Sequence, residues 1–425
     1  MAPNNSLGST YLLAEAKVEK VHSKNGGERI STEVNNNIPL DTDVQCSTLQ
    51  HGNQKENSNL KIFKSKEDLA VKDETKTKTG YFEQDLVWIN IIAFAILHTG
   101  ALYGLYIIFT EQLYKLYIYS HIVGYFSSVG VTAGAHRLWA HKAYKAKWPL
   151  RLILMILQTV AFQNCIHEWV RDHRVHHKFC DTTADPHNSK RGFFFSHMGW
   201  LLMKKHPDVK EKGKTIDMSD IEADPIAMFQ KKYYFYMMPF LSFVLPAVIP
   251  WYFFGYEFRQ TFFVSSILRY IFSLHLTWFV NSAAHLWGFK PYDKSINPSD
   301  NRFVIAIANG EGYHNYHHVF PWDYKAAELG SYFFNYTKVF IDNFAKIGWA
   351  YDLKTVSDDM IRKRILRTGD GSHKVSGQQK KIDELIRQLD HEKEENLVWG
   401  WDDKDMTEED RKEATIINYV HVKCN

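Results

Sequence analysis

The histidines of this 425-residue chain are its strongest chemical signal. Fourteen of the 21 lie between His136 and His318, and nine of these fall into short patterns. The patterns are one HxxxxH pair, two HxxHH triplets and one histidine that follows Asn-Ser-Ala-Ala: His136 and His141; His173, His176 and His177; His314, His317 and His318; and His285. Because neutral imidazole is a good ligand for zinc, copper, iron and nickel, the patterns predict a metal centre.

The spacing predicts how these side chains are presented. Positions i, i+3 and i+4 of a helix share one face, so we expect each HxxHH to project its three imidazoles toward one point. On an ideal helix the two histidines of HxxxxH point about 140° apart. They converge only if the helix is distorted there, or else they serve different metals. Asn281 and His285 are four residues apart and are expected on one face.

Nine imidazoles without cysteine favour two metals with four or five ligands each. A structural zinc site needs four ligands, usually with cysteine, whereas redox chemistry would justify a pair of irons. Soluble di-iron bundles use two Glu-x-x-His motifs, and these patterns contain that spacing only at Glu311 and His314. Structural histidines without partners are disfavoured, because each would cost about 1–3 kcal/mol when buried.

Four apolar, nearly uncharged runs are available to position these histidines. They cover about 86–109, 116–135, 233–254 and 265–287, and roughly 20 such residues are needed to cross a bilayer as a helix. The fourth run contains one charge, Arg269, which we expect near a membrane surface, where its side chain can snorkel toward water. The run at 152–162 is too short to span. Buried helices of a large soluble protein are the less favoured interpretation.

Four spans predict an all-α integral membrane protein with two transmembrane hairpins. The segment between the hairpins, 137–232, carries 17 Lys and Arg against 10 Asp and Glu, which places it in the cytosol by the positive-inside rule. Both termini and all nine histidines then lie on that side. The expected fold is therefore four membrane helices with a cytosolic helical cap that holds a di-iron centre.

The remaining chain is polar. Residues 1–80 have few apolar side chains and are expected to be a disordered cytosolic extension; 81–371 is the membrane domain, and 372–425 is a charged cytosolic tail with an amphipathic stretch at 380–395. A net charge of +3 gives no reason to expect nucleic-acid binding. Four cysteines without close spacing exclude a disulfide framework or a cysteine-based zinc module.

Several long motifs, in order, resemble the membrane acyl-CoA desaturases (fatty acid desaturase type 1). The resemblance runs from about 81 to 371 and is strongest to animal and insect stearoyl-CoA (Δ9) desaturases. It is carried by Gly130-Val-Thr-Ala-Gly-Ala-His136-Arg-Leu-Trp-Ala-His141, by Glu168-Trp-Val-Arg-Asp-His173-Arg-Val-His176-His177, by Asn281-Ser-Ala-Ala-His285 and by Gly310-Glu-Gly-Tyr-His314-Asn-Tyr-His317-His318. Val398-Trp-Gly-Trp-Asp-Asp-Lys resembles the tails of insect members.

The resemblance implies a ligand set and substrate contacts. Two iron ions would be held by the nine histidines, with Asn281 reaching one iron through water, and no catalytic residue beyond the metal ligands is expected. Arg171, Asp172, Asn90, Lys204 and Lys205 match residues that bind the CoA head group. Trp169, Thr277 and Trp278 match residues that line a bent acyl tunnel.

The implied activity is that of an oxidoreductase of the endoplasmic reticulum membrane. It would introduce a cis double bond, at Δ9, into a saturated long-chain acyl-CoA, with O2 as co-substrate. Two electrons would come from free cytochrome b5 and its NADH-dependent reductase, since the sequence lacks the HPGG motif of a fused cytochrome b5 domain.

Three alternatives stay open at this point. A membrane di-iron hydroxylase would share the metal chemistry but insert oxygen. A catalytically silent membrane scaffold would share only the fold, although intact ligands argue against it. A histidine-rich metal transporter would place its ligands inside the bilayer, whereas these histidines lie at the ends of the apolar runs.

Overall fold

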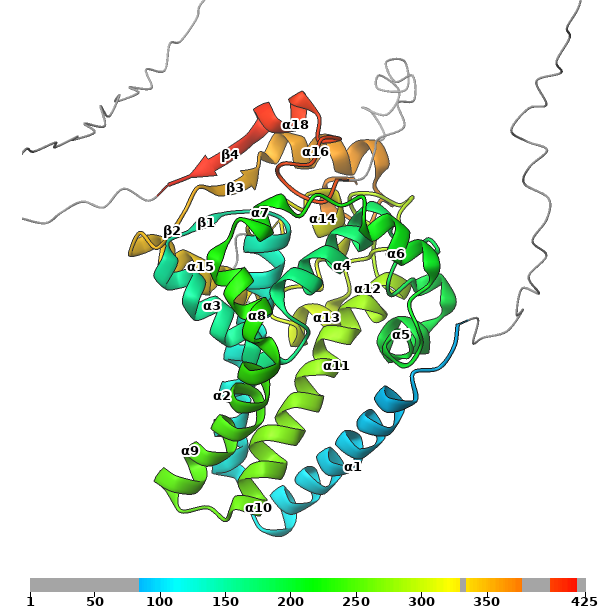
Figure 1. Ribbon diagram of the computed structural model, residues 1–425. Helices are drawn as coiled ribbons and strands as arrows, with labels where there is room; N and C mark the ends of the chain where they lie inside the picture. Colours follow the sequence, from blue (N-terminus) through cyan, green and yellow to red (C-terminus); the bar gives the residue numbers. More distant parts are fainter. Residues whose placement is uncertain (1–83, 329–333, 377–397, 419–425) are drawn as a thin grey trace, which may run out of the picture. The chain divides into compact units, whose positions relative to one another are not determined.

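The computed structural model describes residues 84–328, 334–376 and 398–418 (Figure 1). The predictions for 1–80 and for 380–395 lie outside the described residues. Helices make up most of what is described, and their bounds are α1 Trp88–Thr110, α2 Tyr114–Val129, η2 Gly130–Ala140, α3 Trp148–Ala161, α4 Ile166–Lys178, η3 Ser189–Arg191, η4 Phe195–Gly199, α5 Trp200–Leu202, α6 Pro207–Gly213, α7 Ser219–Glu222, α8 Pro225–Pro239, η5 Phe240–Val244, α9 Leu245–Phe254, α10 Phe258–Thr261, η6 Phe262–Leu268, α11 Arg269–Asn281, α12 Ala283–Leu286, α13 Arg302–Ile307, α14 His314–Val319, α15 Tyr336–Lys346, α16 Asp358–Thr368 and α18 Glu408–Glu413.

Two small antiparallel sheets qualify the all-α prediction. Strand β1, Lys145–Ala146, pairs with β2, Ala350–Tyr351. Strand β3, Leu353–Val356, pairs with β4, Ala414–Ile417, so that Leu353 lies opposite Ile417. Each pair joins segments that are far apart in the chain, which sequence periodicity alone does not reveal.

Among the described residues, three helical stretches are long and apolar enough to cross a membrane. They are Trp88–Thr110, Pro225–Phe254 and Phe258–Leu286, and they cover the first, third and fourth predicted spans. The second predicted span lies in α2, of 16 residues, and η2, of 11, which follow each other without a break. Together they are long enough to cross a bilayer, but this stretch is not among the three. A fourth span would also result if the bent pair α3–α4, with its 82° bend, crossed as one unit. The part of the chain that the structure describes therefore holds three or four candidate spans, and the two hairpins stay a prediction.

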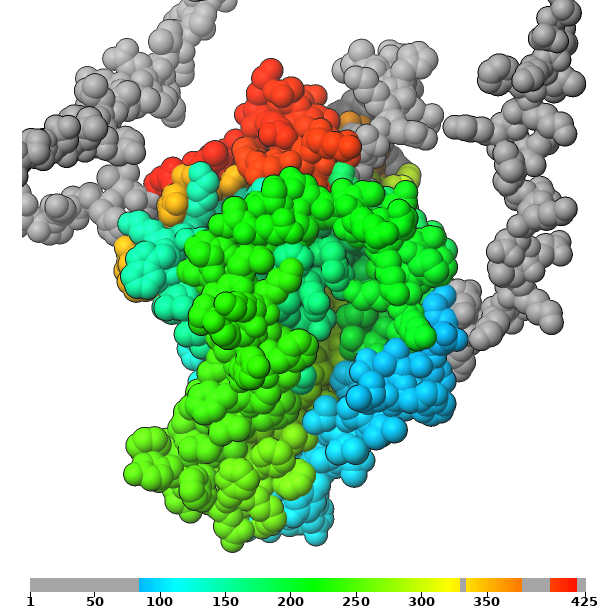
Figure 2. All heavy atoms as spheres, in the orientation of Figure 1, coloured from blue at the N-terminus to red at the C-terminus, as the bar shows by residue number. Residues whose placement is uncertain are grey.

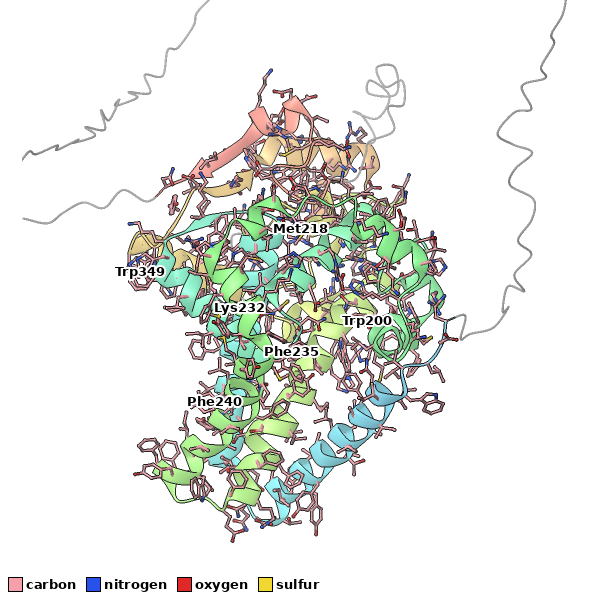
Figure 3. The ribbon with its side chains drawn as sticks, in the orientation of Figure 1. Trp200, Met218, Lys232, Phe235, Phe240 and Trp349 are labelled. Carbon is pink, nitrogen blue, oxygen red and sulfur yellow. The ribbon has the colours of Figure 1, made fainter. Side chains whose placement is uncertain are left out.

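The surface of these stretches is apolar. In Figure 3 the lower half of the described unit shows almost only carbon, including Phe235 and Phe240, whereas nitrogen and oxygen gather in the upper half. Phe235 is 81% exposed and Phe253 is 70% exposed. An apolar face of this extent is what a lipid-facing surface requires. The polar upper half, which includes α4 and α14, would then lie outside the hydrocarbon.

Arg269 does not reach outward as the sequence suggested. It is 4% exposed, and its guanidinium donates to the carbonyls of Ser265 at 3.0 Å and Ser242 at 2.7 Å. Both acceptors lie in the π-helical segments η5 and η6. Because a π-turn displaces the usual i to i−4 bonds, backbone carbonyls there become available. The expectation of a snorkelling arginine was therefore wrong.

The helices that carry the histidines pack against a common hydrophobic core. Trp139, Leu154 and Ile166, from η2, α3 and α4, are among its buried members. A Cβ added to Gly130 would lie 2.3 Å from the backbone nitrogen of Gln158, so η2 and α3 approach closely only because this residue is glycine. The close approach fixes the helix of HxxxxH against its neighbours.

Candidate metal centre

The nine predicted histidines form two groups with converging ring nitrogens. The first, which we call the five-histidine group, contains His136, His141, His173, His177 and His317. The second, the four-histidine group, contains His176, His285, His314 and His318. Within each group the candidate ligand atoms lie within 4.8 Å of one another. All nine residues named from the sequence are thus brought together.

Each HxxHH is divided between the groups, so the expectation that its three imidazoles share one point was wrong. His173 and His177 belong to the five-histidine group, whereas His176 belongs to the other. In the second triplet, His314 and His318 stay together and His317 separates. On a helix, i and i+4 differ by about 40°, whereas i+3 and i+4 differ by about 100°. Each triplet therefore supplies candidate ligands to both groups and links the two groups through one helix.

The HxxxxH pair converges through the distortion that the sequence required. His136 lies in the π-helix η2 and His141 is its C-terminal cap. The backbone N–H of His141 donates to the carbonyl of His136 at 3.1 Å, which is the i to i+5 bond of a π-turn. The two ring centroids are 4.8 Å apart. The wider turn brings positions five apart to the same side.

The Nε2 atoms of the five-histidine group point at one another. Nε2 of His136 lies 2.9 Å from that of His317, and the His141 and His173 pair is 2.8 Å apart. His317 and His177 are 3.1 Å apart. An imidazole has a single ring proton when neutral, so a network of this kind cannot be satisfied by hydrogen bonds alone. A cation at the shared point would satisfy it.

The four-histidine group shows the same convergence. Nε2 of His314 lies 3.0 Å from that of His285 and 3.1 Å from that of His318. Nε2 of His176 is buried and has no hydrogen-bond partner among the described residues. A buried polar atom without a partner costs about 1–3 kcal/mol, and here it is aimed at the other three rings. The donor set thus fits a metal ion.

A carboxylate and a distant carbonyl hold the outer edges of the five-histidine group. Nδ1 of His136 lies 2.9 Å from Glu311, which also accepts from Arg137 at 2.7 Å. Nδ1 of His141 donates to the backbone carbonyl of Trp399. An acceptor at Nδ1 places the proton there and leaves the Nε2 lone pair free for a metal.

Two aspartates of one loop do the same for the four-histidine group. Nδ1 of His176 lies 3.0 Å from both oxygens of Asp185, and Nδ1 of His285 lies 3.3 Å from Asp181. Asp181 is itself held by the Ser189 hydroxyl at 2.5 Å. These carboxylates follow the first HxxHH closely in the chain, so the loop and the ligand helix form one local unit.

The electrostatics favour neutral rings at six of the nine histidines and charged outer partners; at His176, burial is outweighed by Asp185 and Asp181, which raise the pKa. Burial, followed by neighbouring histidines, lowers the pKa of six rings well below the usual value: His141, His173, His177, His314, His317 and His318. Burial favours the neutral acid at Glu311, but Arg137 and His136 lower its pKa to about 2. Likewise His176 outweighs burial and lowers the pKa of Asp185. Neutral imidazoles backed by carboxylates are good metal ligands.

Asn281 stands apart from the histidines. It is the last residue of α11, and its side chain has no hydrogen bond to another described residue. Its place just before α12, which carries His285, is consistent with the predicted contact through water.

Two of the five residues predicted for the CoA head group line a cavity, and two more contact one of them or its partner. Lys204 and Lys205 line a cavity of about 170 Å³ together with Asp185 and Arg191. Lys205 is paired with Asp172, and Arg171 donates to the same aspartate at 2.9 Å. Asn90 lies apart at the start of α1, where it donates to the Leu201 carbonyl at 2.8 Å.

The three residues predicted for the acyl tunnel do not share one contact. Trp169 stacks on the ligand ring of His173 with centroids 4.7 Å apart. Thr277 accepts from Gln163 at 2.9 Å. Trp278 is 2% exposed and packs edge-on against Phe94 at 5.7 Å.

The roles of several residues of the site were not predicted from the sequence. Glu311, Asp181 and Asp185 are carboxylates within nine residues of a histidine motif, and that proximity was a usable signal. Gln163 had no such signal. The Trp399 carbonyl could not be found, because every residue carries a backbone acceptor.

Comparison with known proteins gives a consistent result. The family model described as fatty acid desaturase matches residues 114–340. An acyl-CoA Delta-9 desaturase of Acheta domesticus is 56% identical over 343 residues, which are 81% of this chain and 89% of that protein. An acyl-CoA Delta12-desaturase of the same species is 53% identical over 79% of this chain and 88% of that protein. The stearoyl-CoA desaturase of Homo sapiens is 54% identical over 68% of this chain and 80% of that protein.

Proposed function

This chain belongs to the fatty acid desaturase family, and from that membership we propose that it is an acyl-CoA desaturase that introduces a cis double bond at the Δ9 position of saturated long-chain acyl-CoA. The observation that carries the proposal is the pair of histidine groups, in which all nine motif histidines converge on two points. The reaction would use O2 and two electrons, and the enzyme is an oxidoreductase.

Two iron ions are the proposed occupants. The five-histidine group would hold one and the four-histidine group the other, with Asn281 reaching the second through water. Bound iron would supply, with O2 and two electrons, the oxidising power to remove two hydrogens from adjacent methylenes. Three of the rings are kept in place by carboxylates of the chain: Glu311, Asp181 and Asp185 accept the Nδ1 protons of His136, His285 and His176.

The cavity lined by Lys204 and Lys205 would receive part of the CoA head group. CoA carries phosphates, and lysine and arginine are suitable partners for them. Lys204, Lys205 and Arg191 line the cavity, and Arg171 contacts Asp172 beside it. Because Asp185 lines the same cavity and also holds His176, the head-group site and the four-histidine group share a wall.

The position of the double bond would depend on a few local contacts. Relatives with Delta-9 and Delta12 names are 56% and 53% identical to this chain, so overall similarity does not separate the two outcomes. A fixed bend would decide which methylenes lie near the irons. Trp169 beside His173 and the Gln163–Thr277 hydrogen bond are the proposed elements of that bend, with Trp278 packed behind.

The proposed setting is the endoplasmic reticulum membrane, with the metal centre and both termini on the cytosolic side. Cytochrome b5 and its NADH reductase are the proposed electron donors. We further propose that 81–371 is the membrane desaturase domain, preceded by a disordered extension at 1–80 and followed by a charged tail at 372–425.

Expression in a cell that lacks its own Δ9 desaturase tests the function. The expected result is restored growth and a Δ9 monoene, with the double bond located by mass spectrometry of dimethyl disulfide adducts. A Δ12 or Δ11 product would refute the proposed position, and a hydroxylated product would favour the hydroxylase. If neither the wild type nor a matched high-expression clone forms any product, the enzyme proposal fails.

A further inference from the structure

The end of the chain returns to the five-histidine group. Residues Val398–Ile417, which we call the C-terminal strap, lie outside the 114–340 range of the family match. Figure 2 shows the strap (red) on the outer surface at the end of the unit that carries α4 and α14. Val398 and Trp399 are nevertheless only 8% and 6% exposed, because their side chains face inward.

The strap contacts the first histidine motif through backbone atoms. The Trp399 carbonyl accepts from Nδ1 of His141, and the backbone N–H of Trp401 donates to the His141 carbonyl at 3.2 Å. Between them, a Cβ added to Gly400 would lie 2.7 Å from the His141 carbonyl oxygen and 2.9 Å from its Cα. Only a glycine allows this approach. The strap therefore holds both the ring and the backbone of one candidate ligand.

The strap also contacts α4, which carries the second motif. The guanidinium of Arg174, one residue after His173, lies 4.3 Å from the Trp399 ring centroid. Nζ of Lys178, one residue after His177, donates to Asp403 at 2.8 Å. The two motifs that supply four of the five rings are thus clamped by the same short segment.

The C-terminal strap is itself held firmly by the rest of the protein. Asp403 is fully buried and accepts from the Trp399 N–H at 2.7 Å, which closes the turn that presents the carbonyl. Val398 and Met406 join a hydrophobic cluster with Tyr316 of α14. Further on, β4 pairs with β3 over four residues. An incidental contact would not bury a carboxylate or add a strand.

We propose that the C-terminal strap is a positioning element of the desaturase, which keeps His141 in the tautomer and orientation that the five-histidine group needs. The inference rests on the proposed di-iron function, since it assigns a role within that site. Loss of the strap would leave the His141 ring without its Nδ1 acceptor and free to rotate. The four-histidine group has its own aspartates and would keep its metal.

The experiment compares bound iron in the purified full-length wild type with that in the variants Gly400→Ala and Asp403→Ala. Asp402→Ala is the matched control, because Asp402 is the neighbouring carboxylate, is half exposed and, among the described residues, forms an ion pair only with Lys142 at 3.0 Å. Iron per chain is measured after a timed chelator challenge, with Mössbauer spectroscopy of ⁵⁷Fe-loaded protein to distinguish the two sites. Hydrogen exchange across 398–417 reports whether the strap is docked.

The expected result is two irons in the wild type and in Asp402→Ala, and selective loss of one iron signal in Gly400→Ala and Asp403→Ala. Affinity at that site should fall about 10–100-fold, as for other outer partners of metal ligands. If a variant undocks the strap yet keeps both irons, the proposed positioning role of the strap is wrong, whereas the di-iron proposal is unaffected. A wild type without iron would overturn both. Equal loss of both irons would also overturn the assignment, since it would indicate general unfolding.

Discussion

The two histidine groups are built from the same motifs but held in different ways. Each HxxHH contributes to both groups, so their inner parts are interlocked. The outer partners differ. The four-histidine group depends on Asp181 and Asp185, from one loop next to α4. The five-histidine group depends on Glu311 and on the Trp399 carbonyl, 258 residues beyond His141.

The groups also differ in their access to the surface. His285 of the four-histidine group lines a cavity of about 200 Å³ together with Lys190 and Lys290. Asp185, its outer partner, lines the cavity proposed for the head group. Neither of these two cavities is lined by a member of the five-histidine group. The four-histidine group is therefore held by nearby residues and faces the proposed substrate side. The five-histidine group is closed off by parts of the chain that are distant in sequence.

The largest expected effect comes from replacing a ring that has no partner except a metal. His176→Ala should lower turnover by at least about 100-fold and remove the iron of the four-histidine group, because Nε2 of His176 is otherwise unsatisfied among the described residues. The matched control is His187→Ala. His187 is buried beside His176, with ring centroids 4.5 Å apart, and its Nδ1 lies 3.4 Å from Asp185. It belongs to neither group, so its loss should weaken the iron no more than the loss of Asp185 does.

Product formation and bound iron measure this difference. If His187→Ala loses iron as His176→Ala does, membership of the groups has been assigned incorrectly.

The next effect tests whether the outer partners act on separate sites. Asp185→Asn and Glu311→Gln should each weaken a different iron by about 10–100-fold, because each removes the charge that supports one Nδ1–H. Chelator release rates for the single variants and the double variant measure the effect. Since the two carboxylates share no hydrogen-bond partner among the described residues, the losses in free energy should add. Strong coupling would show that the groups are not independent.

A smaller effect is expected on product position. Thr277→Val removes the acceptor of the Gln163 hydrogen bond, so the bend should loosen and the double bond should scatter over neighbouring positions, with both irons retained. The control is Thr99→Val, because Thr99 is exposed and its hydroxyl bonds within α1. An unchanged, single double-bond position in Thr277→Val would remove Thr277 from the proposed bend.

The last effect is on stability and not on activity, and it concerns β3, on which the strap docks. Burial lowers the pKa of Lys354 to about 8, although Asp402 and Asp352 oppose the shift while Lys145 and Lys142 add to it. Between about pH 8 and 10.5 the unfolded chain binds more protons at this group, so the wild type should gain stability as pH rises. Relative to Lys354→Met the gain should be at most roughly 3 kcal/mol.

Thermal unfolding of both proteins at about pH 7.5 and about pH 9.5, on either side of the lowered pKa, measures this difference. The loss of the hydrogen bond to the Lys142 carbonyl contributes an offset that does not depend on pH. A stability difference that does not change with pH would show that Lys354 is not held in a low-pKa environment.

Side-chain patterns made most of the candidate ligands predictable, and backbone geometry decided what was missed. The nine histidines and the need for a distorted helix at HxxxxH could be predicted, and η2 confirms the distortion. The division of each HxxHH was not foreseen, because a shared helix face was read as a shared point. Arg269 was misplaced because the acceptors that hold it are carbonyls of π-helical turns. The Trp399 carbonyl has no signature in the side-chain sequence.

Anomalous diffraction at the iron edge from the purified, iron-loaded protein tests the central claim most directly. The account predicts two iron peaks, one enclosed by Nε2 atoms of His136, His141, His173, His177 and His317 and the other by those of His176, His285, His314 and His318. A single peak, a peak outside these groups, or a metal other than iron at both positions would contradict it.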